Sequence, residues 1–73
     1  MTLLDSRYDS GIITAIGGDA ETHRRLVDLG LLKARYEIKA RRKSAMYVYF
    51  DCGVHGFSAV VEARVAQCMR TAR

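Results

Sequence analysis

The sequence predicts a small, mainly β domain that is interrupted by one short helix. Residues 35–41 and 46–52 alternate apolar and polar side chains with a period of two, which is typical of strands that lay one face on a core. Residues 19–30 change to helical spacing and end at a glycine. A chain of 73 residues has room for one compact core, so we expect a single domain spanning residues 1–73.

The first strand is expected at residues 11–16, where β-branched side chains precede the turn-forming pair Gly17 and Gly18. Asp19 then provides a suitable N-cap for the helix. Leu26 and Leu29 fall on one helical face, and a helix of about nine residues is too short to be stable alone. We therefore expect both leucines to pack on the sheet.

The second half of the chain predicts three strands in a meander. A polar connection at residues 42–45 and a glycine-bearing loop at residues 53–56 are each short enough for a hairpin, and the last of these strands covers residues 57–61. Residues 62–70 have the spacing of one or two helical turns, after which the chain end rejoins the barrel or frays. The expected apolar sides are Tyr36, Ile38 and Ala40 in one strand, and Met46, Val48, Phe50 and Cys52 in the next.

Short strands in so small a chain must hide the edges of their sheet. This favours a closed or nearly closed SH3-like barrel with one inserted helix, at about residues 19–30, and a short C-terminal helical turn. The competing architecture is a three-stranded sheet with one helix packed on it.

Composition limits the classes of function. A net charge of +4 and a pI near 9.4 are compatible with nucleic acid, an anionic membrane surface or an acidic protein as partner. No apolar run approaches the ~20 residues needed to cross a bilayer and the N-terminus lacks the pattern of a signal peptide, so we expect a cytoplasmic protein. Cys52 and Cys68 are too few for a disulfide framework and are expected to be reduced and buried.

The sequence contains no recognisable catalytic motif. We find no glycine-rich phosphate loop and no nucleophile with a base at useful spacing, so we expect a binding protein without a cofactor. Cys52 and His55 lie three residues apart across a turn, but a metal site needs three or four clustered ligands, and we predict none.

Three stretches, in order and at the right spacing, resemble the ferrous iron transport protein A family, FeoA. They are residues 11–18, residues 25–31 with the sequence RLVDLGL, and the strand around Tyr36 and Ile38; the match continues through residues 57–61 and 66–69. The resemblance implies a cytoplasmic bacterial SH3-like barrel that serves as an adaptor of FeoB, the membrane GTPase-linked ferrous iron permease. Similar modules also form the C-terminal domain of metal-dependent repressors, which keeps a regulatory, transition-metal-responsive role open.

We expect the partner to bind at the end of the helix and at the neighbouring basic turn. The candidate residues are Arg24, Arg25, Leu31, Leu32, Arg41, Arg42 and Lys43. The leucines also have a simpler interpretation as core residues, and exposure of Leu31 or Leu32 would favour a docking surface. A weak homo-oligomer is also compatible with the sequence.

The alternative partner is nucleic acid. The alternation places Arg35, Lys39 and Arg41 on one strand face, beside Tyr47 and Tyr49 of the paired strand. Interleaved basic and aromatic side chains on a sheet bind single-stranded nucleic acid. A solvated outer face with cross-strand tyrosine packing is the simpler interpretation.

Overall fold

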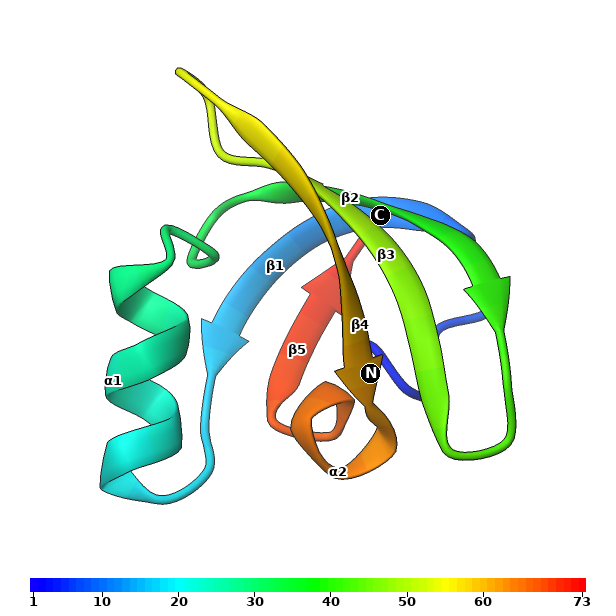
Figure 1. Ribbon diagram of the computed structural model, residues 1–73, viewed down its shortest axis with the longest axis horizontal. Coiled ribbons are helices and arrows are strands. Elements are labelled where there is room, and N and C mark those ends of the chain that lie inside the picture. Colours follow the sequence, from blue (N-terminus) through cyan, green and yellow to red (C-terminus); the bar gives the residue numbers. More distant parts are fainter.

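The computed structural model describes residues 1–73 and consists of five strands and two short helices (Figure 1). All strand pairs are antiparallel, and the sheet has the order β4-β3-β2-β1-β5. The sheet curves around the core into the expected SH3-like barrel, which excludes the three-stranded alternative. Along the chain the elements are β1 (Ser10–Ile16), α1 (Ala20–Asp28), β2 (Arg35–Arg41), β3 (Ala45–Asp51), β4 (Gly56–Glu62), α2 (Ala63–Ala66) and β5 (Met69–Ala72).

The core confirms the alternation of β2 and β3. Tyr36, Ile38, Met46, Val48 and Phe50 all lie with at most 7% of their surface exposed. The hairpin is continuous except for a bulge, where the register shifts between Ile38 and Ala40. A bulge turns the following side chains away from the simple alternation, which leaves Ala40 half-buried.

Helix α1 begins as expected and packs less than expected. Thr22 N–H donates a 2.8 Å hydrogen bond to the Asp19 carboxylate, which confirms the N-cap. Leu26 is buried, but the prediction for Leu29 is wrong, since this side chain is 51% exposed. The helix ends at Asp28, so Leu29 is already the C-cap residue. Neither helix is long and apolar enough to span a bilayer.

The C-terminal residues form the predicted short helical turn and then rejoin the barrel, although the turn is shorter than the pattern of residues 62–70. Only Ala63–Ala66 is helical, and Met69 and Arg70 already belong to β5, which pairs with β1. Met69 is fully buried. Pairing with β1 and burial of Met69 outweigh the weak local helical preference.

The N-terminal residues complete the barrel on the side of β5. Leu3 is fully buried, and its N–H donates to Met69 O at 2.8 Å. Thr71 N–H donates to Met1 O at 2.9 Å. The Ser6 and Tyr36 hydroxyls are hydrogen-bonded at 3.1 Å in the interior. The segment before β1 thus covers the free edge of β5.

Candidate docking site

The candidate site lies where α1 ends and the chain turns back to β2. Gly30 has φ +83, its N–H donates to Val27 O at 2.9 Å, and Leu31 N–H donates to Leu26 O at 3.2 Å. These two bonds are the pattern of a Schellman motif, in which glycine takes the left-handed conformation without steric cost. The motif brings Leu31 back onto Leu26, and both belong to the core.

Leu31 and Leu32 therefore have different roles. Leu31 is 2% exposed, so its side chain is a core residue and does not belong to a docking surface, as the simpler interpretation of the sequence had it. Leu32 is 44% exposed, and Leu29, three residues earlier in the chain, is 51% exposed. Two exposed leucines within four residues of the chain, on so small a domain, are candidates for an interaction site.

The turn that presents Leu32 is anchored to β1 by backbone hydrogen bonds. Lys33 N–H donates to Ile13 O at 2.8 Å, and Ile13 N–H donates to Ala34 O at 2.9 Å. Lys33 has φ +69, the left-handed region that non-glycine residues rarely adopt. Leu32 is thus held between the buried Leu31 and an anchored, strained residue, and its outward direction is fixed by the backbone.

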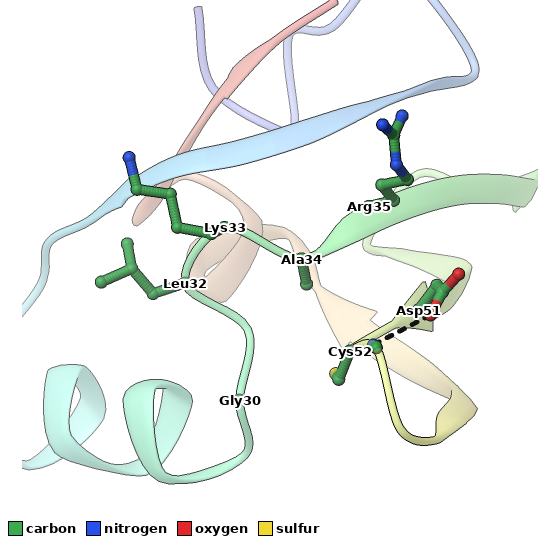
Figure 2. Close-up of a pocket in the computed structure, with 8 residues that line it drawn as sticks. Gly30, Leu32, Lys33, Ala34, Arg35, Asp51 and Cys52 are labelled. Carbon is green, nitrogen blue, oxygen red and sulfur yellow. Dashed lines mark hydrogen bonds between the residues drawn. The ribbon is translucent and has the colours of Figure 1, made fainter.

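Beside this turn is a shallow cavity of about 310 Å³ (Figure 2). The turn forms one wall, and the start of the β3–β4 loop forms the other, where Gly53 N–H donates to the Asp51 carboxylate at 3.0 Å. Lys33, Arg35 and Asp51 give the cavity both signs of charge, and none of the three forms an ion pair within the chain. The lining residues are Gly30, Leu32, Lys33, Ala34, Arg35, Asp51, Cys52 and Gly53.

Cys52 lies in the same cavity and is half-buried, as is Cys68, whereas the sequence predicted buried thiols. The Cys52 thiol is 3.8 Å from Leu29 O. Partial burial, with a smaller effect of the Asp51 carboxylate, raises the pKa of this thiol above its ordinary value. A raised pKa lowers the fraction of the reactive thiolate at neutral pH. The chain has no group of three or more His, Cys, Asp or Glu side chains placed to hold a metal ion.

The structure separates the other candidate residues into two groups. Arg24 and Arg25 are exposed on α1, where Arg25 is paired with Glu21 at 3.1 Å. The β2–β3 turn with Arg42 and Lys43 lies on the opposite side of the view from α1 (Figure 1). The helix end and the basic turn, which were expected to form one binding region, are thus set apart in the fold (Figure 1).

Arg41 is held by the N-terminal segment and is not free for a partner. Its guanidinium donates to Ser6 O at 3.0 Å and lies 3.3 Å from the Asp9 carboxylate. The bulge after Ile38 explains this position, because it shifts the register so that Arg41 lies opposite Met46. Arg41 is therefore not in line with the other outer side chains of β2.

The outer face considered for nucleic acid is broken by acidic groups. Lys39 is paired with Glu37 at 2.9 Å, and Arg35 lies opposite Asp51 in the register of β2 and β3. Tyr47 and Tyr49 are exposed on this face as expected, at 47% and 37%. With carboxylates interleaved among the cations, the face lacks the continuous positive potential that phosphate contacts require.

Two features of this surface were not found from the sequence. Leu29 was assigned to the core by its spacing from Leu26, although its position next to Gly30 signals the last residue of a helix. The contribution of residues 51–53 to the cavity depends on how the β3–β4 loop folds back toward the end of α1, which no local pattern indicates.

Comparisons with known proteins identify no relative of this chain. No family model, curated protein or solved structure matches it.

Proposed function

We propose that this domain is a non-catalytic adaptor that binds a protein partner through the docking site at the end of α1. The observation that carries the proposal is the exposed pair Leu29 and Leu32, held in place by the Schellman motif and by the anchored turn. A rigid presentation of apolar side chains lowers the entropic cost of docking. Lys33 and Arg35, which line the same cavity as Leu32, add cations that are not paired within the chain.

The partner we propose is the cytoplasmic part of the FeoB iron permease. Support comes from the resemblance of residues 11–18 and 25–31 to FeoA, together with an SH3-like barrel of the kind that this family implies. The role would be accessory to ferrous iron uptake in the bacterial cytoplasm. In this proposal the domain contributes a docking surface, and the transport chemistry belongs to the permease.

The test is a binding titration of the full chain against the purified cytoplasmic portion of the permease. The wild-type chain should bind saturably, and Leu32→Glu should weaken binding at least tenfold, because a carboxylate replaces the central apolar contact. Tyr8→Glu is the matched control, since Tyr8 is exposed to a similar extent, at 46%, on the segment before β1. Equal weakening by both variants, or no binding by the wild type, would refute the proposal.

A further inference from the structure

The two edge strands of the sheet differ in how well they are protected against pairing with a further strand. The edge strand β5 has four residues, carries Arg70, is bulged against β1 and is covered by the N-terminal segment. The other edge strand, β4, has seven residues and pairs with β3 in an unbroken register from Gly56 to Glu62. Proteins commonly protect edge strands with charges, proline, bulges or covering segments. Of these protective features, strand β4 has only a charged residue, Glu62, at its end.

The hydrogen bonds around β4 show which backbone groups are left open. Cys52 N–H donates to His55 O, and Ala63 N–H donates to Ser44 O, so the residues that exchange hydrogen bonds with β3 are Phe57, Ala59 and Val61. Ser58 and Val60 alternate with them and direct their N–H and C=O groups away from β3. Both residues are exposed, Val60 to 69%. The sheet pairs β4 with no second strand.

An apolar groove of about 170 Å³ runs along the inner side of this open edge. Phe57 and Val61 of β4 form one wall, and Leu26 and Leu29 at the end of α1 form the other. A strand added to β4 would point alternate side chains into this groove and the others to the outer face, as adjacent residues of a strand do. Leu29 joins the groove to the docking site described above.

Cations gather at one end of β4. The 2.9 Å hydrogen bond from Ala63 N–H to Ser44 O holds the β2–β3 turn, which carries Arg42 and Lys43, against the end of β4 and the start of α2. Both are exposed and neither forms an ion pair, while Glu62 is the only acid on β4. A second copy of this chain is disfavoured as the occupant, because both copies carry a net charge of +4. An acidic segment is complementary.

We propose that β4 is a site of β-strand addition, which takes an extended segment of a partner protein with alternating apolar side chains and carboxylates at one end. The apolar side chains enter the groove between β4 and α1, and the carboxylates meet Arg42 and Lys43. The proposal rests on the proposed function only in taking the partner to be a protein, and it does not require that partner to be the permease.

The test follows amide hydrogen exchange of the full chain by NMR with two probes. One is the cytoplasmic portion of the permease, and the other is a synthetic peptide of alternating valine and threonine with two aspartates at one end. Either probe should slow exchange of the Ser58 and Val60 amides at least tenfold. The Phe57 and Ala59 amides are internal controls, because β3 already binds them.

A backbone variant gives a second readout. Val60→Pro removes the outward N–H without removing a hydrogen bond to β3, and edge strands tolerate proline at such positions. It should weaken binding of the peptide at least tenfold, whereas Val60→Ala, which keeps the N–H, should weaken it much less. If Val60→Pro does not fold, the exchange measurement on the wild-type chain still decides the matter.

The outcomes separate this inference from the proposed function. Protection of Ser58 and Val60 by the peptide supports strand addition even if the permease does not bind. Permease binding without any protection of these amides by either probe overturns strand addition and leaves the adaptor role intact. Protection that rises with the concentration of the chain alone shows that the occupant is a second copy, which overturns the proposed partner.

Discussion

Leu31 and Leu32 are neighbours in the chain and lie on opposite sides of the barrel wall, with 2% and 44% of their surfaces exposed. The left-handed Gly30 before them and the anchored Lys33 after them fix this arrangement. One leucine therefore stabilises the fold, and the other is free to bind.

Truncating the two leucines should separate these roles. Leu31→Ala should lower the free energy of unfolding by about 2–4 kcal/mol, because it removes a core side chain and leaves a cavity. Leu32→Ala should change it by less than about 0.5 kcal/mol, as is usual for exposed positions. Urea unfolding followed by circular dichroism measures both. A similar loss of stability in the two variants would contradict the proposed division.

Replacing Lys33 by glycine should stabilise the protein. A side chain at φ +69 carries a steric cost that glycine avoids, partly offset by the greater flexibility of glycine in the unfolded chain. We expect a gain of about 0.5–1 kcal/mol, measured as a higher urea midpoint at an unchanged slope. Lys33→Ala is the control, since alanine keeps the Cβ atom and should show no such gain. A loss of stability in Lys33→Gly would refute this explanation.

The buried hydrogen bond between Ser6 and Tyr36 should be measurable by a double-mutant cycle. Ser6→Ala should cost about 1–3 kcal/mol, since it leaves the buried Tyr36 hydroxyl without a partner. Tyr36→Phe should cost less, because the Ser6 hydroxyl keeps its 2.8 Å bond to Tyr8 O. The double variant should be more stable than the sum of the single losses predicts. Strict additivity would show that the two hydroxyls do not interact.

The cap at Asp19 should make the stability of α1 depend on pH. The hydrogen bond from Thr22 N–H is the largest cause that lowers the pKa of this carboxyl below its ordinary value of 3.8. A carboxyl with a lowered folded-state pKa stabilises the fold above its unfolded-state pKa, and this contribution is lost as the pH falls through the folded-state value.

Asp19→Ala should accordingly lower the melting temperature at pH 7, and the difference from the wild type should shrink as the pH falls below 4. Asp19→Asn keeps an oxygen that can accept from Thr22 and should recover part of the stability at pH 7. Thermal unfolding at several pH values provides the measurement. A difference that stays constant down to pH 2 would contradict the assignment of the charged cap.

The elements predictable from the sequence are those with strong local signals. The alternation from Arg35 to Asp51 defines β2 and β3, because each strand buries one face against the core. The cap at Asp19 and the glycine at position 30 bound the helix for equally local reasons. In these segments the local preference and the tertiary packing agree.

The remaining features depend on contacts between distant segments. Strand β5 has four residues and exists through its pairing with β1, so the local spacing alone could not show where the helical turn ends and the strand begins. Leu3 is buried because the N-terminal segment closes the barrel. The same segment provides Ser6 O, which accepts a hydrogen bond from Arg41, and Asp9, which forms an ion pair with it. The same limit applies to the site, where spacing alone could not tell the buried Leu31 from the exposed Leu29.

The most direct measurement of the central claim is an NMR titration of the isotope-labelled full chain with the cytoplasmic portion of the permease. The account predicts that the largest shifts occur in residues 29–35 and in β4, with Tyr8 and the segment before β1 unchanged. Shifts confined to the outer face around Tyr47 and Tyr49, or no shifts at all at saturating concentrations of the permease, would contradict it.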